Sequence, residues 1–187
     1  QEDRLQQLET ALISHEVTKI DNSVMSQYSS LGAEIELLPG YDKRYEIIND
    51  YVLSTLKMHR GKTIRNIYKV KIPTERQNYL DNDFGMENIA HLFHGTNNKN
   101  IRHILRTGLI VPRVYTNGRR FGAGIYLADH SAKSLNYTAK VNRNAPDFLF
   151  ITDAAIGNPH KRRDMDSSLT AAPSGYHSVW GTDSYGG

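Results

Sequence analysis

Residues 121–137 read FGAGIYLADHSAKSLNY and carry the densest pattern of the sequence. Glycines crowd its beginning, which predicts the end of a glycine- and arginine-rich loop. The apolar run from Ile125 to Leu127 then predicts a short strand. The residues that follow are typical of a helix near 131–140, with Asp129 or Ser131 as its N-cap. The stretch therefore predicts a strand that turns directly into a helix.

Three side chains of this stretch could meet on one flat ligand. Ser134 and Tyr137 are three residues apart, so they share a face of the expected helix. Tyr126 lies just before them on the expected strand. The two rings are suited to sandwich an aromatic heterocycle, and the serine hydroxyl is suited to bind its amide. The alternative is that both tyrosines are half-buried core residues.

A second motif lies upstream, where the apolar run from Ala90 to Phe93 predicts a strand that ends in His94-Gly95-Thr96. Glycine has no Cβ, so at a strand end it lets a ligand approach the backbone closely. Its N–H and C=O could then hold a carboxamide, while the flanking imidazole and hydroxyl could bind ribose hydroxyls. The alternative is a purely structural turn from strand to helix.

The rest of the sequence alternates short helices, strands and polar loops. In chain order it predicts an amphipathic helix over residues 3–16, a strand over 33–38, a helix around 47–56, a strand over 64–72, a polar loop over 74–88, a helix between Asn97 and Gly108, a loop over 112–124, a buried strand over 148–156 and a loop over 157–187. A loop as long as the last one is unusual inside a compact domain, so we expect the fold to continue beyond Gly187.

The composition describes one globular domain without cysteine chemistry. Of the 187 residues, 39% are hydrophobic and 23% are charged, which suffices for a packed core. The absence of cysteine excludes disulfides, thiolate metal sites and a cysteine nucleophile. It fits an intracellular protein, nuclear in a eukaryote or cytoplasmic in a bacterium. No signal peptide or membrane-spanning run is visible, so no membrane partner is expected.

The charged residues indicate neither a metal nor a large nucleic-acid surface. The net charge is +3, and its scatter favours an ordinary solvated surface, apart from the cluster Lys161-Arg162-Arg163. None of the eight histidines forms a convincing pair of metal ligands. His91 and His94 are three apart on a strand, where they point to opposite faces. No metal is therefore expected.

Taken together, the motifs resemble the catalytic domain of the poly(ADP-ribose) polymerases. The resemblance covers roughly residues 28–187 and is strongest between residues 92 and 137. It rests on His94-Gly95-Thr96, Ile104-Leu105, Gly108-Leu109, the runs Phe121–Asp129 and Ser131–Tyr137, and the tail Gly175–Val179.

The resemblance implies a fold and a division of the chain. The fold would be the α+β ADP-ribosyltransferase fold, in which two packed, mixed or antiparallel β-sheets with flanking helices surround an NAD cleft. Residues 29–187 would form the catalytic domain, without its C-terminal strands. Residues 1–28 would be a helical segment left from a helical regulatory domain. NAD would be the substrate.

The resemblance also implies roles for the candidate residues. His94 and Tyr126 would be the catalytic histidine and tyrosine, with His94 holding the adenine-side ribose and Tyr126 stacking on nicotinamide. Tyr137 would stack on the opposite side of the nicotinamide ring. The Gly95 backbone would bind the carboxamide, helped by the hydroxyl of Ser134.

Three more residues match family positions near the ligand, and one departs from the family pattern. Thr96 replaces the usual serine and keeps the hydroxyl, while Asn100 and Lys133 match directly. Ile110 stands where an arginine often follows the Gly-Leu pair.

The implied function is NAD-dependent transfer of ADP-ribose to a protein or nucleic-acid acceptor, with any DNA or RNA contact made through other domains. The family's catalytic glutamate is missing, because no Glu follows Glu87, and we expect it beyond Gly187. One alternative is a catalytically inactive module that binds NAD or ADP-ribose. Another is a tRNA 2′-phosphotransferase, which shares the fold and a His-Gly-Thr-like start. The Gly-Ile-Tyr and Ser-x-Lys-Ser-x-Asn-Tyr runs favour the polymerase-like family over this last alternative.

Overall fold

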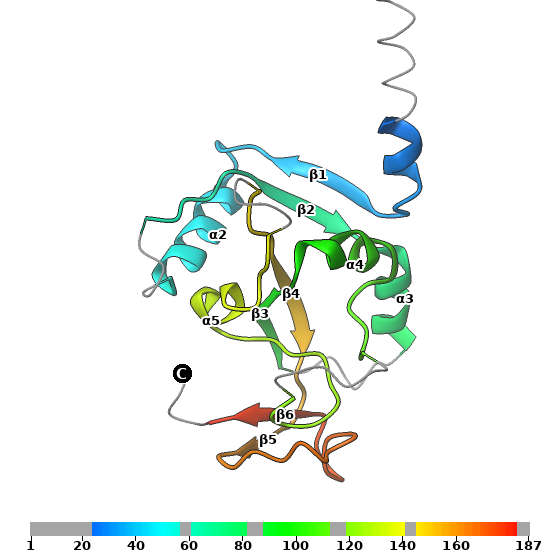
Figure 1. The fold of residues 1–187 in the computed structure, drawn as a ribbon, viewed down its shortest axis with the longest axis vertical. Coiled ribbons are helices and arrows are strands. Elements are labelled where there is room, and N and C mark those ends of the chain that lie inside the picture. Colours follow the sequence, from blue (N-terminus) through cyan, green and yellow to red (C-terminus); the bar gives the residue numbers. More distant parts are fainter. Residues whose placement is uncertain (1–23, 57–60, 82–87, 113–118, 141–144, 183–187) are drawn as a thin grey trace, which may run out of the picture.

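The computed structural model describes residues 24–56, 61–81, 88–112, 119–140 and 145–182 (Figure 1). Its helices and strands follow one another in the order β1 (Glu34–Leu38), α2 (Lys43–Ser54), β2 (Ile67–Lys71), α3 (Pro73–Asp81), β3 (Ile89–Gly95), the 3-10 helix η1 (Asn98–Asn100), α4 (Ile101–Thr107), α5 (Ser131–Leu135), β4 (Leu149–Ala155), β5 (Pro159–Arg162) and β6 (Ser178–Gly181).

The strands of the described residues form three two-stranded sheets. β1 pairs antiparallel with β2, β3 antiparallel with β4, and β5 parallel with β6. In Figure 1 the β3–β4 pair lies between the other two, with α2 and α5 on one side of it and α3 and α4 on the other. The predicted α+β class is therefore confirmed.

The core is built around β3 and its aromatic residue Phe93, which is fully buried. Its ring stacks on Tyr51 of α2, with centroids 4.6 Å apart and an interplanar angle of 22°. The backbone N–H and C=O of Phe93 point away from β4 and exchange two hydrogen bonds with Ala128, of 2.7 and 2.9 Å. β3 thus has β4 on one edge and the segment around Ala128 on the other. The other buried apolar side chains in the described part of the chain are Ala33, Leu38, Leu56, Ile72, Leu92 and Ile104.

Most of the predicted elements around β3 are confirmed. The strands expected over 33–38, 64–72 and 90–93 are β1, β2 and β3, and the helix around 47–56 is α2. The helix between Asn97 and Gly108 is also present, although its first turn is the 3-10 helix η1. The Asn97 side chain accepts a hydrogen bond from the Lys99 amide at 3.0 Å, and Gly108 ends α4 with φ at 76°.

The loop predicted over 74–88 is wrong over its first half, where α3 forms. Pro73 opens this helix, and Glu75 lies in its first turn, where a carboxylate meets the positive end of the helix dipole. The Glu75 side chain also accepts a hydrogen bond from the Leu109 amide at 3.0 Å. This contact docks α3 beside the end of α4, which polarity alone does not reveal.

Residues 125–140 depart most from the expectation. The strand over 125–127 does not form, and Ala128 alone bridges to Phe93. The helix expected near 131–140 ends at Leu135, because the chain after it is bound by distant partners: the Asn98 amide donates to the Ala139 carbonyl at 3.0 Å. Neither Asp129 nor Ser131 caps this helix, since the N-cap is His130.

The C-terminal expectations also need correction. The buried strand over 148–156 exists as β4, but it is only partly buried, with Ile151 36% exposed. The loop over 157–187 contains β5 and β6, two strands of four residues each. They are held at one end by Asn158, whose carbonyl accepts from the His177 amide at 3.0 Å.

Two predictions concern the N-terminal part. The helix over 3–16 lies outside the described residues. Residues 24–29 are helical, and the Tyr28 hydroxyl of this helix accepts a hydrogen bond from the Ile35 amide of β1 at 3.0 Å. The division of the chain at residue 28 stays a prediction.

Candidate active site

His94 lies near the end of β3 with its ring orientation fixed. Its Nδ1 is 2.9 Å from the Tyr126 carbonyl oxygen. A carbonyl only accepts hydrogen bonds, so Nδ1 carries the proton and donates it. The other ring nitrogen, Nε2, is then the one that a ligand hydroxyl could meet. The structure thus joins the two residues that the family resemblance pairs as catalytic, through the backbone of Tyr126.

Gly95 is required for a reason that the sequence did not reveal. A Cβ at this position would lie 1.8 Å from the carbonyl oxygen of Ser134, so only glycine lets α5 pack this close to the strand. The packing of α5 is therefore one reason for glycine here, and the approach of a ligand to the Gly95 backbone stays a prediction. The backbone polar groups of Gly95 lie on the edge that faces away from β4, since alternate residues of a strand share an edge and Phe93 bonds there to Ala128.

Ser134 is brought directly against this strand. The side chain is buried, and its hydroxyl donates a hydrogen bond to the Phe93 carbonyl at 3.0 Å. The donor is therefore used within the protein, and the lone pairs of the hydroxyl are what remain for an amide N–H of a ligand. β3 and α5 are thus in close contact, through the hydrogen bond of Ser134 to Phe93 and the packing of Ser134 against Gly95.

The hydroxyl of Thr96 is held by a neighbour. Asn100 Nδ2 donates to Thr96 Oγ1 at 2.9 Å, across the turn that contains η1. With one lone pair occupied in this way, the hydroxyl hydrogen of Thr96 remains available as a donor. Thr96 and Asn100, which both match family positions near the ligand, are therefore side by side.

Tyr126 is anchored by the glycine-rich turn before it. Its hydroxyl donates to the Gly122 carbonyl at 2.8 Å and accepts from the Phe121 amide at 3.0 Å. Gly122 has φ at 80°, and a Cβ there would lie 1.9 Å from the carbonyl oxygen of Leu169. The turn therefore packs against the segment between β5 and β6.

Tyr126 and Tyr137 both present ring surface to solvent, with exposed fractions of 39% and 59%. Residues that hold a ligand by stacking need such a surface, whereas core residues do not. That the two rings are parallel and enclose a ligand stays a prediction, as does the role of Lys133 on α5.

Asp147 is a residue whose importance the sequence did not reveal. It anchors the chain after Tyr137, since its carboxylate accepts from Thr138 Oγ1 at 3.0 Å and from Lys62 Nζ at 2.5 Å. Lys140 Nζ lies 3.5 Å away. Partial burial acts to raise the pKa of Asp147, but the hydrogen bonds from Lys62 and Thr138 and the two lysine charges outweigh it. The pKa therefore lies below its usual value of 3.8.

This lowered pKa predicts a loss of stability in acid. A carboxyl whose pKa is lower in the folded state stabilises the fold above its unfolded pKa, and that contribution is lost as the pH falls below about 4. We expect Asp147→Asn to cost about 1 kcal/mol at pH 7 and to flatten the pH dependence below pH 4, measured by urea unfolding. Asp164→Asn, at an exposed carboxyl, is the control. Equal pH profiles of the two variants would show that Asp147 is not stabilising.

The other aspartates after β3 with resolved contacts also have protein partners. Asp129 pairs with His130 at 2.8 Å, Asp153 with His91 at 2.7 Å, and Asp166 with Arg162 at 3.0 Å. The carboxylate of Asp129, which the sequence offered as a helix cap, thus pairs with His130 instead. Asp183 lies outside the described residues.

The described residues contain neither a cluster of metal-ligating side chains nor a helix that could span a membrane. In these parts of the chain, no three or more His, Cys, Asp or Glu side chains are grouped as metal ligands would be. No described helix has the length and apolar character needed to cross a membrane.

Comparison with known proteins places these residues in a family. The family model described as "Poly(ADP-ribose) polymerase catalytic domain" matches residues 42–186, a range that contains every candidate site residue. The chain belongs to this family. The resemblance seen in the sequence is thereby confirmed, and the ADP-ribosyltransferase fold follows from the membership.

Several members of the PARP family are similar to the chain over most of its length. It is 30% identical to the human protein mono-ADP-ribosyltransferase PARP3 over 166 residues, and this alignment covers 87% of the chain and 30% of that relative. It is 29% identical to mouse protein mono-ADP-ribosyltransferase PARP4, over 84% of the chain and 8% of the relative. It is 30% identical to zebrafish (Danio rerio) poly [ADP-ribose] polymerase 1, over 82% of the chain and 16% of the relative. The chain thus spans less than a third of each of these PARP proteins.

Proposed function

We propose that the chain is the NAD-binding part of an NAD-dependent ADP-ribosyltransferase, which cleaves the nicotinamide–ribose bond and transfers ADP-ribose to a protein or nucleic-acid acceptor. The observation that carries the proposal is that β3, α5 and the segment before α5 are hydrogen-bonded to one another. Hydrogen bonds between three residue pairs connect them: one from His94 to Tyr126, one from Ser134 to Phe93, and two between Phe93 and Ala128. These contacts gather the candidate residues of two separate motifs at one end of β3.

The geometry suggests how NAD would be held. The backbone polar groups of Gly95 lie on the edge of β3 opposite β4 and would bind the nicotinamide carboxamide, with Ser134 Oγ accepting from its amide. The exposed rings of Tyr126 and Tyr137 would stack on nicotinamide, and His94 Nε2 would meet a ribose hydroxyl. We further propose that the three small sheets belong to the two packed sheets of the family fold, with NAD in a cleft at this end of β3.

The reaction develops positive charge on the ribose as the nicotinamide leaves, so a nearby carboxylate would stabilise the transition state. We do not assign this role to Asp129, Asp147, Asp153 or Asp166, because each already binds another side chain. The described residues of this chain would therefore bind and orient NAD, and orientation of a substrate by itself can contribute much of a rate enhancement.

Incubation of the full-length protein with labelled NAD tests the proposed transfer. Label on the protein itself, or on an added protein or nucleic acid, is the expected result. NAD binding without transfer would favour the catalytically inactive module instead. A protein that neither binds nor consumes NAD would contradict both.

Tyr137→Ala is expected to weaken NAD binding by about 1 to 3 kcal/mol, the scale of a lost stacking partner. The ring is largely exposed, so its loss should leave the unfolding free energy almost unchanged. Titration calorimetry with NAD measures the effect. Tyr41→Ala is the control, because Tyr41 is 92% exposed and lies in the turn before α2. Equal affinities of the two variants would show that Tyr137 does not contact the ligand.

A further inference from the structure

The helix α5 depends on another element for its N-terminal cap. The first amides of any helix lack partners within the helix and need acceptors from elsewhere. The His130 side chain at the N-cap makes no capping bond and is engaged with Asp129 instead. The acceptors come from the end of α2: Thr55 Oγ1 accepts from the Ser131 amide at 2.9 Å, and the Thr55 carbonyl from the Ala132 amide at 3.4 Å.

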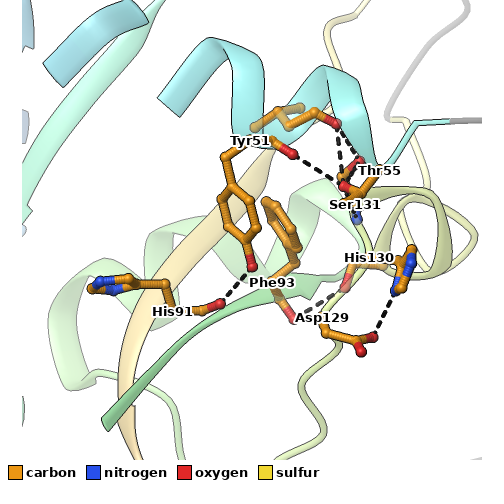
Figure 2. A network of polar contacts seen from close by, with 9 residues as sticks. Tyr51, Thr55, His91, Phe93, Asp129, His130 and Ser131 are labelled. Atoms are coloured by element: carbon orange, nitrogen blue, oxygen red, sulfur yellow. Dashed lines mark hydrogen bonds and ion pairs between the residues drawn. The ribbon is translucent and has the colours of Figure 1, made fainter. Parts of the chain in front are cut away.

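Two hydroxyls complete this contact, as Figure 2 shows. Thr55 Oγ1 donates to Ser131 Oγ at 2.9 Å, and Ser131 Oγ donates onward to the Val52 carbonyl at 2.7 Å. With the Ser131 amide donating to Thr55 Oγ1, each hydroxyl both gives and receives a hydrogen bond. Ser131 is fully buried, so any group left without a partner here carries the full cost of desolvation.

The end of α2 is in turn fixed to β3. The Tyr51 hydroxyl donates to the His91 carbonyl at 2.6 Å, and its ring stacks on Phe93 (Figure 2). Phe93 also accepts the hydrogen bond from Ser134 of α5. Each of the three elements β3, α2 and α5 therefore contacts the other two. Thr55 and Ser131 make the contact between the two helices.

We propose that Thr55 and Ser131 are positioning residues for NAD, acting through α5 and not by touching the ligand. α5 has only five residues and leads directly to Tyr137, so without its external cap it has little stability of its own. Loosening it would displace Ser134 from Gly95, and small displacements of binding groups have large effects on substrate use. The inference rests on the proposed function, since NAD is the ligand that α5 would position.

The test replaces Thr55 by valine, which keeps the shape and removes the hydroxyl. We expect NAD affinity to fall about tenfold in titration calorimetry. The Thr55→Ser variant keeps the hydroxyl, so it should bind NAD as the unmodified chain does. Thr107→Val is the matched control, because among the described residues the Thr107 hydroxyl at the end of α4 bonds to the carbonyls of His103 and Gly108 and not to α5. It should lose stability to a similar degree without losing NAD affinity.

Hydrogen exchange of the same variants separates this inference from the proposed function. Thr55→Val should speed exchange at the amides of Ser131, Ala132 and Ser134, while the amides of α4 stay protected. Ser131→Ala should act on the same amides, and the double variant should lose no more affinity than the stronger single variant, since both cut one link.

Three results would overturn the inference: unchanged exchange in α5, NAD affinity unchanged by Thr55→Val, or equal losses of affinity in Thr55→Val and Thr107→Val. Failure of the unmodified chain to bind NAD would instead overturn the proposed function. In that case the exchange at α5 still decides whether Thr55 and Ser131 hold this helix.

Discussion

Gly95→Ala is expected to destabilise the fold by about 3 kcal/mol or more, at or beyond the upper end of what overpacking usually costs. The added methyl group would lie 1.8 Å from the Ser134 carbonyl oxygen, which is backbone and cannot rotate away as a side chain could. Either α5 moves off β3, or β3 shifts and disturbs the Phe93 stack. NAD binding should be lost in both cases, because Gly95 and Ser134 separate.

Urea unfolding and NAD titration of the variant measure the two effects. Gly124→Ala is the matched control from the glycine-rich turn, since a Cβ there meets nothing within 4 Å. Its unfolding free energy should stay within about 0.5 kcal/mol of the original. A Gly95→Ala chain that is as stable as the control and still binds NAD would show that β3 and α5 are not in close contact.

His94→Ala is expected to lower kcat/KM of the full-length protein for NAD by about 100-fold, the scale of losing a group that orients a reacting substrate. The fold should survive, because the side chain is only partly buried and, within the described parts of the chain, makes one hydrogen bond, to the Tyr126 carbonyl. The unfolding free energy should change by about 1 kcal/mol.

His91→Ala tests whether position on the strand matters. His91 lies on the same strand as His94 but pairs with Asp153, and both of these side chains are more than two-thirds exposed. Its removal should leave NAD use unchanged. A His94 variant that melts early and yet turns over NAD at the original rate would mark His94 as a structural histidine.

The local sequence predicted the elements whose signals are local. β3 was predictable because an apolar run leads into His94-Gly95-Thr96, and α4 because Asn97 and Gly108 mark its two ends. α3 had a local signal too, in Pro73 at its first position and Glu75 in its first turn, but its polar surface resembles a loop.

What the sequence could not supply is the set of contacts between distant residues. α5 is capped by Thr55, which lies 76 residues before Ser131, and Asp147 is held by Lys62 at a separation of 85 residues. No periodicity or capping pattern carries such information. The role of Gly95 shows the same limit: the need for glycine was visible, but the reason for it depends on where α5 packs.

The packing of Gly122 against Leu169 has a consequence for the order in which the protein matures on the ribosome. The turn that anchors the Tyr126 hydroxyl has its contact partner far downstream, where the Ala123 amide donates to the Leu169 carbonyl at 2.7 Å. α2, β3 and α4 leave the exit tunnel long before that partner is synthesised. The contacts that anchor Tyr126 can therefore be completed only late in translation, after most of the core has had time to assemble.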